Sequence, residues 1–324
     1  MSFLHHTSAL HQSAQAAFVL LCARADLNAD AYCVGAEWIK DDKRRLHIVQ
    51  RYDADGCESV VLKHALRPDD QDAFKAVLEA HQYSSDALNG HPSAQVPRIL
   101  AHDHGSKSYL MEFFAGETVL ALCRKSNDHA PVLKAAGGWL SAYHEATFQE
   151  KRAFQPKFMV RHMRHLADQL SRGERKIRGQ KRFVSLAYGM EEHVGDAEGY
   201  IGKVAGKHGD LNAHNILIES DQTVALDFLA RSTAPVAYDI ARFLLSYLQM
   251  VGDISAVPKG HVLPTAAMDA FFDGYTFVGQ NDPTLHFLMR VQILTDWNRR
   301  SDNMTLSNVL RFDRLKKIAR QTFA

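Results

Sequence analysis

The sequence has few cysteines, and none of them is placed as in a disulfide framework or a cysteine metal site. Its 324 residues include four cysteines with no C-x-x-C pair, at Cys22, Cys33, Cys57 and Cys123. Scattered cysteines of this kind are typical of a protein in a reducing compartment. We therefore expect reduced, mostly buried thiols and a cytoplasmic location.

The sequence also lacks a long hydrophobic run and an excess of one charge. The apolar stretch at residues 16–23 is far too short to span a bilayer, and no Arg or Lys precedes it. The net charge of +1 provides no global field to attract nucleic acid or a membrane surface. We expect an ordinary N-terminal helix, no secretory signal, and neither a nucleic-acid nor a membrane partner.

The composition that remains is that of a globular protein, with 46% hydrophobic and 23% charged residues. The length predicts two structural units, or one domain with two lobes. Residues 30–112 have mainly strand character around one helix. The strands are expected at 46–52, 59–63, 96–100 and 108–113, and the helix opens at 69–72.

After Gly116 the pattern becomes helical, and residues 216–226 contain the only obvious β-hairpin. Helices are expected at 131–149, 158–173, 235–251, 265–280 and 284–300, before a basic amphipathic end. The pattern predicts an α+β fold with a helical extension (1–30), a small β-rich N-lobe (31–113) and a larger helical C-lobe (114–324). Ligands usually bind in the cleft between such lobes.

The predicted hairpin carries an unusual density of polar side chains, in the stretch HGDLNAHNILIESDQTVALDF at 208–228. Asn215 and Asp227 offer the hard oxygen ligands that Mg²⁺ prefers, with waters and phosphates completing its shell. Asp210, separated from them by a loop, is suited to accept a proton from an alcohol. The spacing D-x-x-x-x-N followed by a strand-end Asp is the arrangement that kinases use for phosphoryl transfer.

The motifs HGDLNAHNIL, Asp-Phe and Ala-Tyr-Asp-Ile-Ala (237–241) resemble those of the aminoglycoside phosphotransferase and choline kinase family. The resemblance covers residues 30–300 and implies a protein-kinase-like bilobal fold. It implies that Asp210 is the catalytic base and that Asn215 and Asp227 bind magnesium. It also implies that His208 and Asp239 support the catalytic loop.

The N-terminal half agrees with this resemblance. Lys63 resembles the lysine that holds the α- and β-phosphates of ATP, and Glu79 is its expected helix partner, with Asp72 as the alternative. The segment ending at Gly116, LMEFFAG, is similar to the hinge that binds adenine through its backbone. Glu112 and Phe114 are therefore the candidate adenine contacts.

Two features depart from the kinase pattern. The segment CVGAEWI (33–39) has one glycine where a glycine-rich phosphate loop is expected, and Leu229 replaces the glycine that follows Asp-Phe in protein kinases. The poor glycine loop leaves open a catalytically silent nucleotide-binding regulator. A zinc hydrolase that uses His208, Asp210 and His214 is a further alternative, but no second cluster with ligand spacing accompanies them.

The function expected from these patterns is that of an ATP-dependent phosphotransferase with an alcohol acceptor, using ATP and Mg²⁺. The acceptor is a small hydroxylated molecule, with sugars, amino alcohols, choline-like amines and aminoglycosides left open. The family resemblance implies that the acceptor pocket is formed by the helical segments after residue 150 and near Asp296 and Trp297. The basic run at 172–182 is expected to be solvated, or to attract an acidic substrate.

Overall fold

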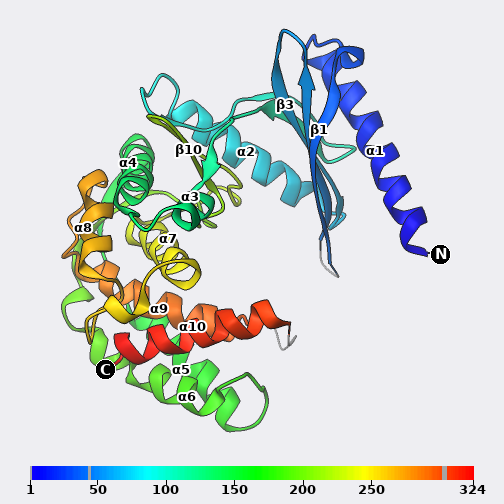
Figure 1. Ribbon diagram of the computed structural model, residues 1–324. Coiled ribbons are helices and arrows are strands. Elements are labelled where there is room, and N and C mark those ends of the chain that lie inside the picture. Colours follow the sequence, from blue (N-terminus) through cyan, green and yellow to red (C-terminus); the bar gives the residue numbers. More distant parts are fainter. Residues whose placement is uncertain (1, 43–44, 301–304) are drawn as a thin grey trace. The chain divides into compact units, whose positions relative to one another are not determined.

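The computed structural model describes residues 2–42, 45–300 and 305–324, and the chain divides into two compact units (Figure 1). Unit 1 contains residues 1–89, 95–115 and 224–231, and unit 2 contains residues 90–94, 116–223 and 232–324. The boundary after residue 115 lies close to the predicted one. The division differs from the prediction in three segments, because the first 30 residues and residues 224–231 belong to unit 1, and residues 90–94 belong to unit 2.

The centre of unit 1 is a five-stranded antiparallel sheet with the strand order β1-β2-β3-β6-β5. Its elements are α1 (Ser2–Arg24), β1 (Cys33–Asp41), β2 (Leu46–Ala54), β3 (Cys57–Arg67), α2 (Gln71–Ala87), β5 (Ile99–Asp103) and β6 (Ser108–Glu112). The segment compared above with a glycine-rich loop is thus the strand β1, paired with β2. The tight β2–β3 turn depends on Gly56, whose φ of +72° is a conformation that glycine adopts without steric cost.

Strand β3 shows how alternating side chains give unit 1 two apolar layers. Leu62 packs in a cluster with Phe18 of α1, whereas Val61 packs in another cluster with Leu78 of α2. Successive side chains of a strand point to opposite faces, so Lys63 shares the face of Val61. Helix α1 is therefore part of the core of unit 1 and not a separate extension.

Unit 2 is mainly helical and also contains a three-stranded antiparallel sheet, β12-β9-β8, which the sequence analysis did not predict. Its elements are β7 (Glu117–Thr118), α3 (Val119–Lys125), α4 (Ala130–Ala146), β8 (Phe148–Ala153), α5 (Lys157–Ser171), α6 (Gln180–Gly189), β9 (Ile201–Gly206), β10 (Ile216–Glu219), β12 (Thr233–Pro235), α7 (Ala237–Met250), α8 (Thr265–Gly274), α9 (Pro283–Asn298) and α10 (Leu306–Thr322). A four-stranded sheet has the order β4-β11-β10-β7, and its strands β4 (Ala94–Gln95) and β11 (Gln222–Ala225) each cross a boundary of the division.

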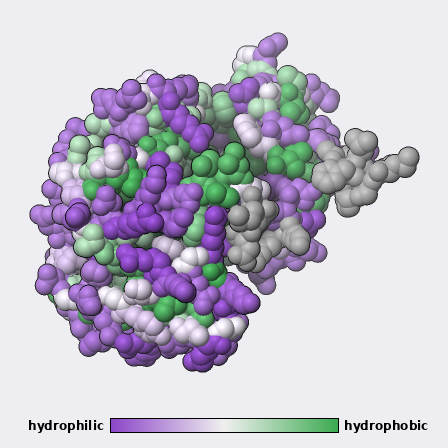
Figure 2. Space-filling view, turned by 60° about the horizontal axis from the view of Figure 1, so that its bottom comes forward, coloured by the Kyte–Doolittle hydropathy of each residue, from purple (hydrophilic) through white to green (hydrophobic). Residues whose placement is uncertain are grey.

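The surface is mixed in character. The face in Figure 2 is mainly hydrophilic, with hydrophobic side chains in separate patches. None of the helices in the described ranges is long and apolar enough to cross a membrane. All four cysteines are free, but only Cys22 and Cys123 are buried, so the expectation of mostly buried thiols fails for Cys33 and Cys57.

Glycine allows the backbones of α4 and α8 to approach each other closely. A Cβ added to Gly274, the last residue of α8, would overlap the main-chain oxygen of Lys134 and lie 2.8 Å from the nitrogen of Gly138. The next residue, Tyr275, places its hydroxyl 2.9 Å from Nδ1 of His144 on α4. The close approach therefore positions a polar contact in the interior of unit 2.

We predict that Gly274→Ala lowers the stability of the protein by about 1–3 kcal/mol, because the added methyl group has no space between the two backbones. Differential scanning calorimetry should show a lower Tm. The control is Gly189→Ala at the end of α6, where an added Cβ meets no atom within 4 Å. An unchanged Tm in Gly274→Ala would contradict the observed packing of α4 against α8.

Candidate active site

The loop that follows β9 is held by one buried carboxylate near the start of α7. Asp239 Oδ2 accepts a hydrogen bond from the amide N–H of His208 at 2.8 Å, and Oδ1 accepts one from the amide of Gly209 at 3.1 Å. His208 is fully buried, and Gly209 has a φ of +87°, which favours glycine. Asp239 therefore fixes the backbone immediately before Asp210.

The charge of Asp239 is stabilised by a histidine of α4. His144 Nε2 lies 3.5 Å from Asp239 Oδ2, and its Nδ1 is hydrogen-bonded to the hydroxyl of Tyr275. Burial alone would raise the pKa of Asp239, but the hydrogen bond and charge of His144, together with the His208 amide, lower it below its ordinary value. The loop is thus held by an ionised acceptor.

Asp210 carries its carboxylate next to an arginine of α7. Arg242 Nη2 donates a hydrogen bond to Asp210 Oδ1 at 2.7 Å. No other hydrogen bond to this carboxylate occurs among the described residues, so Oδ2 is open, and the side chain is 38% exposed. An oriented, accessible carboxylate oxygen is what acceptance of a proton from an alcohol requires.

The side-chain amide of Asn215 forms a hydrogen bond through its nitrogen but none through its oxygen. Its Nδ2 donates to the main-chain oxygen of Asp210 at 3.0 Å, while Oδ1 has no hydrogen-bond partner in the described part of the chain, although the residue is only 8% exposed. An amide oxygen without a hydrogen-bond partner fits a ligand of a hard cation. The described residues contain no cluster of three or more His, Cys, Asp or Glu that could hold a metal.

Asp227 and Lys63, far apart in the sequence, form an ion pair within unit 1. Asp227 has a φ of +66°, which is uncommon for a residue other than glycine and often marks a functional position. Lys63 Nζ also lies 5.9 Å from the ring centre of Tyr109. Burial alone would lower the pKa of Lys63, but the charge and hydrogen bond of Asp227, together with those of Tyr109, outweigh burial and raise the pKa above its ordinary value.

The expected pair between Lys63 and Glu79 is not formed. Glu79 is exposed on α2 and pairs with Lys75 at 3.8 Å, and the alternative partner, Asp72, forms no salt bridge with Lys63 among the described residues. The buried face of α2 instead presents His81, whose Nε2 bonds to a main-chain oxygen of the following loop. The structure therefore replaces the predicted helix partner of Lys63 with Asp227.

The expected adenine hinge begins within β6, and some of its main-chain groups already form hydrogen bonds inside the protein. The amide of Glu112 donates to the oxygen of Arg98 at 3.1 Å, and the Glu112 carboxylate accepts from Arg98 Nε at 3.0 Å. The amide of Phe114 has no hydrogen-bond partner within the described ranges. Of the two candidate positions, Phe114 is the one with an available N–H donor.

The side chains expected to bind the acceptor near the end of α9 already form hydrogen bonds within the protein. Trp297 is 1% exposed, and its Nε1 donates to a main-chain oxygen at 2.8 Å. Asp296 accepts hydrogen bonds from Arg242, Gln249 and Gln292. As they stand, these side chains offer neither an aromatic cage nor a free acidic group for a cationic acceptor.

Sequence reasoning missed two residues of this site, His144 and Arg242. His144 lies in the stretch GGWLSAYHEAT (137–147), within an expected helix to which no contact was assigned. Arg242 follows Asp239 by three residues on α7, and such spacing places both on one helix face. The charge of Arg242 in a largely apolar helix, three residues after Asp239, was the available signal.

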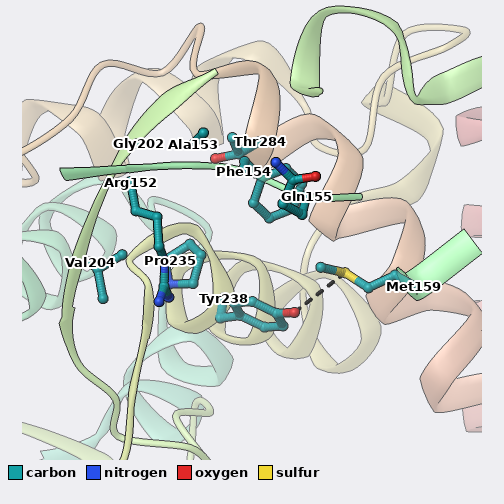
Figure 3. A pocket seen from close by; sticks show the side chains of 10 residues that line it. All are labelled: Arg152, Ala153, Phe154, Gln155, Met159, Gly202, Val204, Pro235, Tyr238 and Thr284. Carbon is teal, nitrogen blue, oxygen red and sulfur yellow. Dashed lines mark hydrogen bonds between the residues drawn. The ribbon is translucent and has the colours of Figure 1, made fainter. Parts of the chain in front are cut away.

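A cavity of about 370 Å³ lies in unit 2, between its three-stranded sheet and helical segments. Figure 3 shows Tyr238 along one side, with its hydroxyl directed at the sulfur of Met159, 3.3 Å away, and Arg152 at the opposite end. Gly202 and Val204 of β9 also line it. The walls are mostly apolar with a few polar groups, as is usual for small-molecule sites.

Two of the elements that line this cavity, β9 and α7, lead into the candidate loop or contact it. Strand β9 continues directly into Lys207, whose Nζ lies 5.2 Å from the ring centre of Tyr238. Tyr238 in turn immediately precedes Asp239. A molecule in the cavity would therefore touch the two elements that hold Asp210 in place.

Residues 47–259 match the model of the phosphotransferase enzyme family. Comparison of the sequence with curated proteins gives no match.

Several solved kinase structures share the fold at low sequence identity. A choline/ethanolamine kinase family protein from Mesorhizobium loti has 12% identity and a TM-score of 0.57, covering 97% of this chain and 100% of that chain. A glucosamine kinase solved with glucosamine, ADP and inorganic phosphate has 14% identity and a TM-score of 0.55, covering 90% and 84%. An amicoumacin kinase solved with AMP-PNP and Ca²⁺ has 12% identity and a TM-score of 0.51, covering 90% and 88%. The predicted α+β, protein-kinase-like fold is confirmed.

We predict that Asp239→Asn destabilises the protein by about 1–3 kcal/mol at neutral pH, because an amide has one acceptor oxygen for two buried N–H donors. Urea unfolding measures the difference. The folded pKa of Asp239 is held below its ordinary 3.8, so its contribution is present above that pH and is lost as the pH falls through the folded value. The gap between wild type and variant should shrink accordingly below pH 3.8.

The control for this measurement is Asp221→Asn, at an exposed position between β10 and β11. This variant should unfold like the wild type at each pH. A gap for Asp239→Asn that did not depend on pH would contradict the role of an ionised Asp239.

Proposed function

The chain belongs to the phosphotransferase enzyme family, and from this we propose that it transfers the γ-phosphoryl group of ATP to a hydroxyl of a small molecule. The observation that carries the proposal is the geometry of Asp210. Its loop is fixed by the buried Asp239, one carboxylate oxygen is held by Arg242, and the other is open. A base held in this way suits acceptor activation.

In the proposed reaction, Asp210 Oδ2 accepts the proton of the acceptor hydroxyl as the acceptor oxygen bonds to the γ-phosphorus. The bond between that phosphorus and the bridging oxygen of ADP breaks, and ADP leaves with the bonding electron pair. The products are ADP, the phosphorylated acceptor and the proton on Asp210, which then passes to solvent.

We propose that Lys63 binds the phosphates of the nucleotide and that the amide of Phe114 binds its base. The raised pKa of Lys63, caused by Asp227, keeps the ammonium group charged for this role. Asn215 and Asp227 are the proposed ligands of Mg²⁺, and the open Oδ1 of Asn215 supports this choice. When bound, the cation neutralises charge on the phosphates. Glu79, paired with Lys75, is not retained in the proposal.

We infer that the cavity beside Tyr238 receives a part of the acceptor distant from the reacting hydroxyl (Figure 3). Its volume and mostly apolar walls suit a small ring or alkyl group, with Arg152 and Gln155 as polar contacts. Support comes from β9 and Tyr238, which continue into the loop of Asp210 and into Asp239. The acceptor class is therefore hydroxylated and partly apolar.

ATP consumption with a panel of sugars, amino sugars, amino alcohols, choline-like amines and aminoglycosides tests the function. We predict that Asp210→Asn lowers turnover by about 10²–10⁴-fold while ATP affinity stays close to that of the wild type, because a general base is lost. Asp227→Asn should lose both turnover and Mg²⁺-dependent ATP binding, because a charged ligand becomes neutral. Calorimetric titration with ATP, with Mg²⁺ and with EDTA, separates the two.

Full turnover in Asp210→Asn with an active acceptor would exclude the proposed mechanism. Nucleotide binding by the wild type without turnover on any acceptor would favour a silent nucleotide-binding regulator.

We predict that Gly202→Leu raises the KM for the acceptor by about tenfold, equivalent to about 1.4 kcal/mol, and leaves kcat and the KM for ATP nearly unchanged. The nearest atom to a Cβ at Gly202 is 3.9 Å away, so a side chain fits the backbone there while filling the cavity. Steady-state kinetics measures the effect. Gly189→Leu, outside the cavity, is the control, and an unchanged acceptor KM in Gly202→Leu would exclude the cavity as part of the acceptor site.

A further inference from the structure

We propose that Arg242 is the positioning residue of Asp210, and that Asp296 acts on the reaction through Arg242. The proposal rests on the proposed role of Asp210 as the catalytic base. It assigns to α7 and α9 a part in catalysis that extends beyond the loop itself.

The guanidinium of Arg242 joins two carboxylates from different parts of unit 2. Its Nη2 donates to Asp210 Oδ1 at 2.7 Å, and its Nη1 donates to Asp296 Oδ1 at 3.2 Å. Its Nε is buried and has no hydrogen-bond partner among the described residues, so the hydrogen bonds of the guanidinium are made with these two carboxylates. A planar guanidinium with fixed donors restricts the orientation of the groups that it binds.

Asp296 is itself held by hydrogen bonds from two glutamines. Its Oδ2 accepts a hydrogen bond from Gln249 at 2.6 Å, and its Oδ1 accepts one from Gln292 at 2.8 Å. Gln249 is 5% exposed, and its Oε1 accepts a hydrogen bond from Arg300. Asp296 is therefore an anchor that cannot turn away from Arg242 without breaking several hydrogen bonds.

The two carboxylate oxygens of Asp210 have different roles: Oδ1 is held by Arg242, and Oδ2 faces the acceptor hydroxyl in the proposed reaction. Arg242 holds Oδ1, so rotation of the carboxylate is restricted and Oδ2 remains in one position for the acceptor hydroxyl. A misplacement of about 1 Å in such a site can cost about 10²-fold in rate. Removal of Arg242 should therefore reduce kcat without removing the base.

The test compares Arg242→Gln, Arg242→Lys, Asp296→Asn and the double variant Arg242→Gln/Asp296→Asn, with the acceptor and ATP varied separately. Arg242→Gln should lower kcat by about 10- to 100-fold and leave both KM values within about threefold of wild type. Arg242→Lys should recover part of the rate, because an ammonium keeps the charge but not the fork. Guanidinium ion added to Arg242→Ala should restore part of the lost kcat.

The double variant isolates the role of Asp296. If Asp296 acts only through Arg242, Asp296→Asn should lower kcat in the wild type but have no further effect in Arg242→Gln. Additive losses of the two substitutions would overturn the coupling between them.

Arg314→Gln is the matched control for a purely structural effect. Arg314 of α10 donates hydrogen bonds to main-chain oxygens at the C-terminal end of the same helix, α7, including that of Leu248 at 2.7 Å. This control should lower Tm and retain kcat at a temperature where it is folded. A loss of kcat in Arg242→Gln that only follows a matching loss of Tm would overturn the positioning role.

Comparison with Asp210→Asn separates this proposal from the proposed function. Wild-type kcat in Arg242→Gln, together with an inactive Asp210→Asn, would overturn the positioning role alone. Full activity in Asp210→Asn would overturn the base, and the positioning role with it.

Discussion

The buried carboxylate of Asp239 is the group on which the candidate site depends. A buried charge is costly unless it is paired and hydrogen-bonded, and Asp239 meets both conditions through His144 and the amides of His208 and Gly209. Its two oxygens fix the backbone on the N-terminal side of Asp210. The packing of α4 and α8 that brings His144 to Tyr275 is thus also a condition for the shape of the loop.

Helix α7 carries both the residue that fixes the loop and the residue that contacts the Asp210 carboxylate. Asp239 and Arg242 lie one turn apart on it, so one rigid element contacts both the backbone before Asp210 and the Asp210 carboxylate. Tyr238, on the same turn, lines the cavity. A displacement of α7 would therefore alter the loop, the orientation of the Asp210 carboxylate and the cavity together. In the proposed function, α7 would thus couple acceptor binding to the positioning of Asp210.

The sequence predicted the fold class and most helices, because their apolar periodicity is strong and lasts for many residues. It missed β8, β9 and β12, since β8 is mostly exposed and charged, β9 contains two glycines and β12 contains a proline. Helix α6 was not predicted, because its start overlaps the basic run at 172–182, which was expected to be a solvated segment. The local sequence signals of these segments are weak, so the segments form strands and a helix only through tertiary packing.

For the site, the family resemblance identified Asp239, whose contacts with the loop are made to main-chain amides. It did not identify side-chain pairs set by three-dimensional packing. Glu79 was chosen as the partner of Lys63 from its place on a helix, but sequence alone does not show which face of α2 is buried. The pairing of Lys63 with Asp227 joins residues 164 positions apart, which no local pattern indicates.

The resting protein pairs each of the two acids proposed for catalysis with its own cation. Asp210 is paired with Arg242 in unit 2, and Asp227 with Lys63 in unit 1. An uncompensated carboxylate repels an anion such as a phosphate, because like charges at close range cost energy. Lys63 has three donors, so its ammonium can bind a further anion without releasing Asp227. Within each unit, the ion pair thus holds its carboxylate in place and reduces the repulsion that this carboxylate exerts on an anion.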